Sequence, residues 1–202
     1  DQGNYWGQQP YGLYSGGYTH QAGGTAGSGS YYHHHDVFSV NNTTTKSLSA
    51  WVFVDWLSGT TSQHTQIGAS SQDGAYHYSG FKGNGQFSGY VGNGSAVLGT
   101  AGDVVTQQWN LITLVQSGTN AYGYVNKNLA ATTTSISNAG SDGTVGYGIN
   151  CGDGGNYKIP GRMSNWALWE EKALSASEIA VLWDLGPAAN WVEDTGPISY
   201  AS

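Results

Sequence analysis

The carboxylates of this chain are the side chains that could hydrolyse a sugar polymer, but their positions do not favour that chemistry. Glycoside hydrolysis ordinarily uses two carboxyl groups that flank the bond to be cleaved. Asp55 and Asp73 each stand alone in their segments. All the glutamates lie in the last part of the chain, at Glu170, Glu171, Glu178 and Glu193. No G-x-S-x-G motif is present, and Cys151 has no recognisable histidine partner. The sequence therefore predicts a protein that is not an enzyme.

A run of histidines followed by an aspartate, His33-His34-His35-Asp36, contains residue types that bind transition metals. Neighbouring residues on a strand point to opposite faces, so only His33 and His35 could converge on one ion. A third ligand would have to come from elsewhere in the chain or from a neighbouring copy. The alternative is that these imidazoles face solvent or make ordinary hydrogen bonds.

The segment Asp73-Gly74-Ala75-Tyr76-His77-Tyr78 has the composition of a glycan-binding patch. Sugars stack on aromatic rings, while aspartate and histidine bind their hydroxyl groups. Tyr76 and Tyr78 would share one face of a strand, with His77 on the other face. The alternative is cross-strand packing of aromatic side chains, which stabilises a sheet without binding a ligand. Four tryptophans are expected in the core: Trp51, Trp109, Trp166 and Trp183.

Composition limits the possible partners. The chain has 202 residues, of which only 9% are charged, and its net charge is −7. Its six basic residues are scattered, whereas nucleic-acid binding needs a basic patch, so we expect no nucleic acid partner. No apolar run approaches membrane-spanning length, so we expect no membrane insertion. Cys151 is the only cysteine, which rules out an internal disulfide.

The length fits one all-β domain with an arm. Residues 1–30 mix Gly, Gln, Ser and Tyr without a clear period, and residues 187–202 form a C-terminal tail after the domain at 31–186. We expect the arm to be ordered by packing on the domain itself or on a neighbouring subunit. The aromatic and aliphatic anchors would be Tyr5, Trp6, Tyr11, Leu13, Tyr14 and Tyr18. The chain begins at Asp1 rather than Met, so we also expect a segment upstream.

Short apolar segments separated by turn residues recur through the domain, and about nine of them are predicted to be strands. They are 36–40, 47–56, 64–70, 75–81, 86–91, 109–116, 121–126, 144–150 and a segment around Met163. The dipeptides Asn84-Gly85 and Asn93-Gly94 favour hairpin turns. Ser175 and Glu178 then form a capping box at the start of a helix that Gly186-Pro187 ends. Many antiparallel strands and one short C-terminal helix predict a two-sheet jelly-roll sandwich.

Three segments resemble the laminin-G-like branch of the concanavalin A-like lectin and glucanase fold, and the last of them resembles its virion-type versions. They are SLSAWVFVDW (47–56), QQWNLITLVQSGTNAYGYVNKNLA (107–130) and GRMSNWALWEEKALSASEI (161–179). The resemblance extends over about residues 36–186 and implies a jelly roll. Two departures stand out: Lys127 replaces a glycine of the usual turn, and Ser164-Asn165 replaces an acidic pair.

The resemblance also implies a calcium ion near one rim, held by an aspartate and backbone carbonyls. The candidate ligands lie in predicted loops: Asp73, Asp103, Asp142 and Asp153. None of these loops is dense in acidic residues, and each aspartate could instead form an Asx turn.

We therefore expect a non-enzymatic surface module of a larger assembly, a virion decoration, fibre or tail-associated protein that also binds glycans. Its partners would be other structural subunits, through residues 1–30, and a cell-surface glycan. This hypothesis places the protein on a virion surface or outside the cell. The first alternative is a secreted carbohydrate-binding or adhesion module of a larger protein, and the second is a polysaccharide-degrading enzyme. The fold hosts all three classes, so it does not choose between them.

Overall fold

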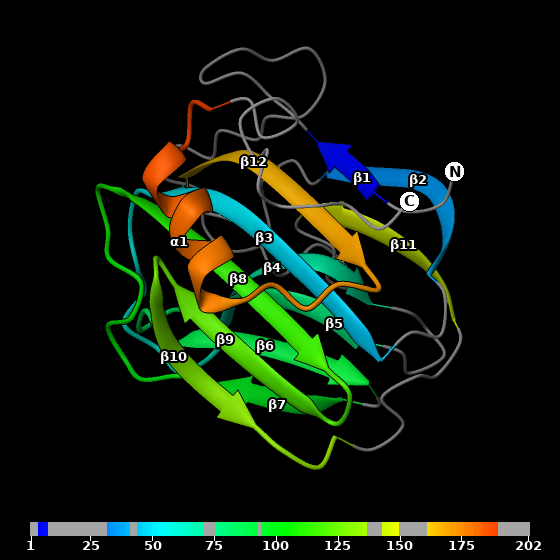
Figure 1. Ribbon diagram of the computed structural model, residues 1–202. Coiled ribbons are helices and arrows are strands. Elements are labelled where there is room, and N and C mark those ends of the chain that lie inside the picture. Colours follow the sequence, from blue (N-terminus) through cyan, green and yellow to red (C-terminus); the bar gives the residue numbers. More distant parts are fainter. Residues whose placement is uncertain are drawn as a thin grey trace.

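The computed structural model describes residues 4–7, 32–40, 44–70, 76–92, 94–136, 143–149 and 161–189, and these form two stacked six-stranded antiparallel sheets and one helix (Figure 1). Sheet A consists, in spatial order, of β1 (Asn4–Gly7), β12 (Gly161–Glu170), β3 (Thr45–Val54), β8 (Trp109–Ser117), β9 (Asn120–Val125) and β10 (Asn128–Thr133). Sheet B consists of β2 (Tyr32–Val40), β11 (Gly143–Ile149), β4 (Gln63–Ser70), β5 (Tyr76–Lys82), β6 (Phe87–Gly92) and β7 (Ser95–Leu98). The predicted jelly-roll sandwich is confirmed.

Three strands of this part of the chain were absent from the sequence prediction: β1, β7 and β10. All three lie at the edges of their sheets. β1 and β7 have only four residues each, too few for an alternating pattern to be detected, and β10 carries mostly small or polar side chains, as edge strands often do. The count of about nine strands was therefore too low because the sequence pattern detects central strands better than edges.

The β9–β10 hairpin shows why Lys127 can stand at a position where a glycine is usual. Asn126, the residue before it, has φ of 60°, in the left-handed region that asparagine tolerates. The Asn126 side-chain carbonyl also accepts a hydrogen bond from the Leu111 N–H at 3.0 Å. Asn126 therefore takes the conformation that glycine would supply, and Lys127 is free to be exposed.

The main core lies between the two sheets. On β3 the side chains of Leu48, Ala50, Val52 and Val54 have no exposed surface, and they face Phe81, Phe87 and Val91 of sheet B. The sheets approach closely at Gly123 of β9, where a Cβ would overlap the ring of Phe87. Glycine is therefore required at this position to keep the Phe87 ring in the core.

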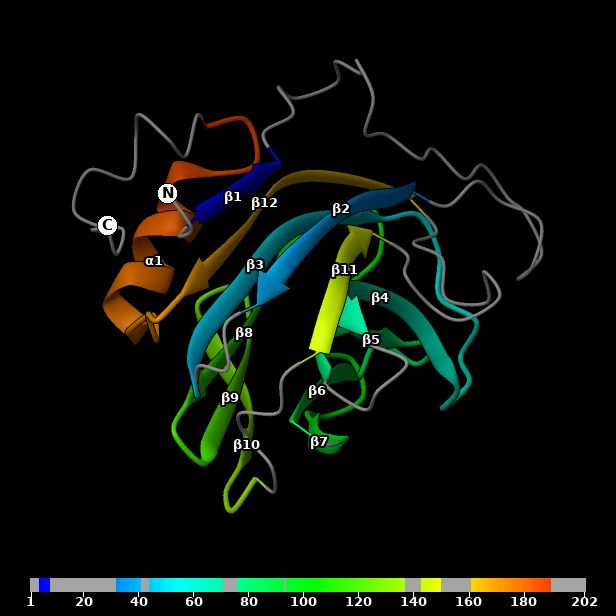
Figure 2. The same ribbon diagram turned by 90° about the vertical axis from the view of Figure 1, so that its right-hand side faces the viewer.

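A second core lies on the outer face of sheet A, under helix α1 (Ala176–Leu185) (Figure 2). Ile179 and Leu182 are fully buried there, and the indole of Trp51 stacks on that of Trp183 with ring centroids 5.1 Å apart. Trp51 is 2% exposed, as predicted for a core residue. Trp109 and Trp183 also pack against this core but are only partly buried, and the side chain of Trp166 lies outside the described residues.

The predicted capping box at the start of α1 is confirmed. The Glu178 N–H donates to Ser175 Oγ at 3.3 Å, and the Ser175 N–H donates to Glu178 Oε2 at 2.8 Å. The Lys172 ammonium pairs with Glu178 Oε1 at 2.7 Å. Partial burial alone would raise the pKa of Glu178, but hydrogen bonds from Lys172 and Ser175 and the Lys172 charge outweigh it and hold this pKa below its ordinary value. Glu178 is thus an ionised structural residue.

The Ser164-Asn165 pair occupies a bulge in β12. The register with β3 shifts between Ser164 and Trp166, and Asn165 has φ of 43°. Ser164 Oγ donates to the Pro187 carbonyl at 2.7 Å, while the Asn165 amide donates to the carbonyls of Pro187 at 3.1 Å and Ala189 at 2.7 Å. An ionised acidic pair could only accept hydrogen bonds and would leave these carbonyls without donors.

Candidate functional site

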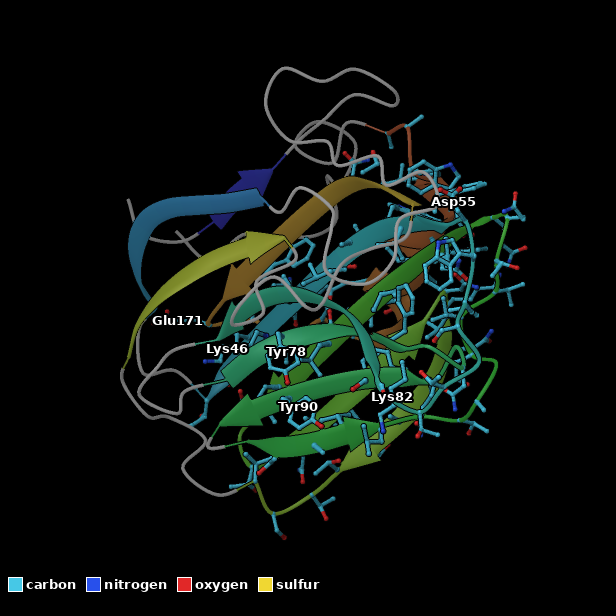
Figure 3. All side chains as sticks on the ribbon, turned by 180° about the vertical axis from the view of Figure 1, so that it is seen from behind. Lys46, Asp55, Tyr78, Lys82, Tyr90 and Glu171 are labelled. Carbon is cyan, nitrogen blue, oxygen red and sulfur yellow. The ribbon has the colours of Figure 1, made fainter. Side chains whose placement is uncertain are left out.

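The outer face of sheet B carries a stacked tyrosine pair. On β5 and β6, Phe81 and Phe87 point into the core, so the alternation of side chains directs Tyr78, Lys82 and Tyr90 outward. We call the outer surface of β4–β7 the tyrosine face. Figure 3 shows Tyr78, Tyr90 and Lys82 together on this side of the molecule, with Tyr78 and Tyr90 on neighbouring strands.

The two rings of the tyrosine face are held by sheet register. Tyr78 lies directly opposite Tyr90 in the β5–β6 pairing. Their ring centroids are 5.0 Å apart, and the ring planes are inclined by 30°. Tyr78 is 9% exposed, whereas Tyr90 is more accessible. Tyr90 is therefore the ring that a ligand can reach, and Tyr78 supports it from one side.

The predicted glycan patch is only partly brought together by the fold. His77 lies on the inner face of β5 and is 2% exposed, so its burial removes it from a surface site. Tyr78 lies on the outer face, but Tyr76 is described only as part of the strand backbone, and Asp73 lies outside the described residues. Tyr90 was missed. The Asn84-Gly85 signal predicts a hairpin here, but a two-residue turn would place Val91 opposite Tyr78; the loop has three residues, 83–85, with Gly85 at φ of 77°, and this shift places Tyr90 opposite Tyr78.

His77 belongs to a polar cluster inside the sandwich. Lys46, Ser79 and Gln116 are buried on inward-facing positions of the same sheets, and Lys46 pairs in register with Gln116. Neither ring nitrogen of His77 makes a hydrogen bond within the part of the chain that the structure describes. Desolvation, and secondly the positive charge of Lys46, lower the pKa of His77 well below its ordinary value of 6.5. The imidazole is therefore neutral in the folded protein at neutral pH.

Most of the predicted metal ligands have side chains outside the described residues, so the metal sites stay predictions. Asp103 is the one candidate calcium ligand whose side chain is described, and its Oδ2 accepts hydrogen bonds from the N–H groups of Thr100 at 2.6 Å and Phe87 at 3.3 Å. Its role is thus to hold the loop between β7 and β8. Asp73, Asp142 and Asp153 lie outside the described residues, and His33 and His35 are described only as backbone of β2. No group of three His, Cys, Asp or Glu side chains gathers in the described part of the chain.

Two stacked antiparallel sheets, with a helix over the outer face of one, define the class of jelly-roll sandwiches. The chain belongs to the concanavalin A-like lectin/glucanases superfamily, whose family model matches residues 26–180. This confirms the resemblance at the level of the superfamily. No curated protein sequence matches the chain. No helix in the described ranges is long and apolar enough to cross a membrane.

Several solved structures share this fold at low sequence identity. The binding domain of Paraclostridial Mosquitocidal Protein 1 has a TM-score of 0.54 and 12% identity over 76% of this chain and 40% of its own. A Trypanosoma rangeli sialidase in complex with 2,3-difluorosialic acid has a TM-score of 0.53 and 16% identity over 69% of this chain and 22% of its own. A structure on cell entry of botulinum neurotoxin type C, by interaction with two ganglioside molecules, has a TM-score of 0.51 and 14% identity over 70% of this chain and 36% of its own. The chain thus spans well under half the length of these proteins.

Proposed function

We propose that the chain is a carbohydrate-binding module without catalytic activity, and that Tyr90 carries the binding. The observation behind this proposal is the stacked Tyr78–Tyr90 pair on the tyrosine face. A pyranose ring has an apolar C–H face that packs on an aromatic ring, and the phenol hydroxyl can bond to a sugar hydroxyl. The stack on Tyr78 restricts the rotamers of Tyr90 before a ligand arrives, which lowers the entropy lost on binding.

Two further observations support the proposal. Among the solved structures of the same fold are the binding domain of Paraclostridial Mosquitocidal Protein 1, a botulinum neurotoxin type C structure described with gangliosides, and a sialidase in complex with 2,3-difluorosialic acid. Two of the described carboxylates also have structural roles: Glu178 is paired with Lys172, and Asp103 holds a loop. The absence of catalysis is part of the proposal.

Replacing Tyr90 by alanine should weaken binding to a glycan by about tenfold, because the stacking surface is lost. A glycan array would select the ligand, and titration calorimetry would then measure its affinity for each variant. Tyr90→Phe keeps the ring and should retain most of the affinity. Tyr124→Ala is the matched control, since Tyr124 is also a partly buried tyrosine but lies on sheet A.

Equal affinities of the Tyr90→Ala and wild-type proteins would contradict the assignment of the site. The bound glycans should also be recovered intact after incubation with the protein. Release of new reducing ends above background would show that the protein is an enzyme.

A second candidate function is a structural subunit of a larger assembly, such as a virion surface protein. It is favoured by β1, a four-residue segment that adds an edge strand to sheet A by pairing with β12 (Figure 1). Tyr5 and Trp6 of the predicted arm are in this strand, paired with Leu168 and Ala167 of the same chain. A segment that completes an edge of its own sheet has the geometry to complete the same edge of a neighbouring copy. The other arm anchors, Tyr11, Leu13, Tyr14 and Tyr18, lie outside the described residues.

On this second function, deletion of residues 1–30 should abolish self-association and leave glycan affinity unchanged. Light scattering coupled to size-exclusion chromatography would measure the mass of both proteins. Assembly of the truncated protein to the wild-type mass would contradict a docking role for the arm.

A further inference from the structure

The tyrosine face carries a single charged side chain on its strands. The sequences of β4, β5, β6 and β7 contain no Asp, Glu or Arg, and their only lysine is Lys82. The chain as a whole has a net charge of −7 and only six basic residues. Among the described strands β4–β7, Lys82 is thus the one lysine or arginine, and the local charge that it supplies is opposite to the net charge of the whole molecule.

Lys82 is placed on the same outward row as Tyr78. The two residues are four positions apart on β5, so their side chains leave the same face about 13 Å apart along the strand. Lys82 is partly exposed, and the described residues provide no carboxylate that pairs with its ammonium. By contrast, Lys172 pairs with Glu178, and Lys46 is buried. The Asp103 carboxylate, in the loop after β7, is engaged by two backbone N–H groups.

We infer that the tyrosine face selects acidic oligosaccharides, with one sugar unit on Tyr90 and the carboxylate of another unit on Lys82. This inference rests on the proposed function and names the ligand class of the same site. Tyr90 lies directly opposite Tyr78, so Lys82 is also about 13 Å from Tyr90 along the strand direction, and this spacing requires a short oligosaccharide rather than a single sugar. A lysine ammonium favours a carboxylate over a hydroxyl through both charge and hydrogen bonding. The lysine is partly exposed, so salt will weaken this preference.

The test compares two matched pairs of glycans, one acidic and one neutral in each. Sialyllactose is compared with lactose, and a galacturonic acid trisaccharide is compared with its carboxyl-reduced form. Wild-type protein should bind the acidic member of at least one pair about fivefold more tightly at low salt. Lys82→Gln should remove this preference, and Lys82→Arg should keep it. Lys127→Gln is the control, because Lys127 is an exposed lysine in the β9–β10 turn of the other sheet.

The possible outcomes separate this inference from the proposed function. The protein could bind acidic and neutral glycans equally well and lose this binding in Tyr90→Ala. That result would refute the acidic preference but would support the carbohydrate-binding function. An acidic preference that survives Lys82→Gln would likewise overturn the role of Lys82. The wild-type protein could also fail to bind either pair and every glycan on the array. That result would refute both the proposed function and this inference.

Discussion

Replacement of Trp51 by alanine is expected to lower the free energy of unfolding by about 4 kcal/mol, because a large buried aromatic side chain is lost and a cavity remains. Trp51 is 2% exposed, lies opposite Leu111 on sheet A and stacks on Trp183 of helix α1. For a domain of this size the loss corresponds to a decrease in melting temperature of about 10 °C. Urea denaturation followed by circular dichroism would measure the difference in free energy.

Trp183→Ala is the matched control for this prediction. Trp183 is only partly buried, so its removal should lower the free energy of unfolding by about 2 kcal/mol. The double variant should lose less than the sum of the two single losses, because both single variants remove the same stack. A Trp51→Ala protein as stable as the wild type would show that α1 does not pack on sheet A as described.

Acidification is expected to destabilise the folded protein through His77. The pKa of His77 is lowered in the folded state, by desolvation first and by Lys46 second, so the unfolded chain binds a proton that the folded chain does not. The stability contributed by the neutral imidazole is therefore complete above the unfolded pKa of about 6.5 and decreases as the pH falls below it. The slope from this one proton is at most about 1.4 kcal/mol per pH unit, and it continues down to the folded pKa.

Urea denaturation of wild type and His77→Gln between pH 7.5 and pH 5 would measure this effect. Glutamine does not titrate, so the variant should lose the part of the pH dependence that His77 supplies, whatever its stability at pH 7.5. Lys46→Met removes the neighbouring charge while keeping a long side chain, and it should make the acid destabilisation smaller. Parallel curves for wild type and His77→Gln would refute the buried neutral imidazole.

The sequence correctly predicted the elements whose local residue pattern matches their burial in the fold. The Ser175 capping box, the Asn84-Gly85 turn and the central strands β3 and β8 each have a clear residue pattern that matches their final environment. The superfamily resemblance rests on the same segments, and the family match confirms it. The arm and tail boundaries and the virion role stay predictions.

The sequence could not decide which face of β5 is buried. The inner face of this strand carries His77, Ser79 and Phe81, and the outer face carries Tyr78, Gly80 and Lys82. The predicted alternation of side chains was correct. Because both faces mix polar and aromatic groups, the sequence did not show which set of side chains faces the core. The packing of sheet B against sheet A shows that His77 is inside. The pairing of β5 with β6 places Tyr90 beside Tyr78.

The sequence pattern also did not predict the hydrogen-bond partners of Ser164 and Asn165. The sequence shows that these two residues replace the usual acidic pair. The carbonyls of Pro187 and Ala189, which accept their hydrogen bonds, come near them only in the folded protein, where α1 packs on sheet A. Long-range hydrogen bonds of this kind depend on the tertiary structure rather than on neighbouring residues.

The position of α1 gives the molecule two different sides. The helix and β1 both lie on sheet A, while the tyrosine face is on the opposite side of the sandwich (Figure 2). A carrier joined through the sheet A side would therefore present Tyr90 of every copy outward, in parallel. Several such copies on one carrier would raise the apparent affinity for a glycan-coated surface by about two to four orders of magnitude, provided that the spacing allows simultaneous contact. Weak recognition by each single copy would then be enough for firm and reversible attachment.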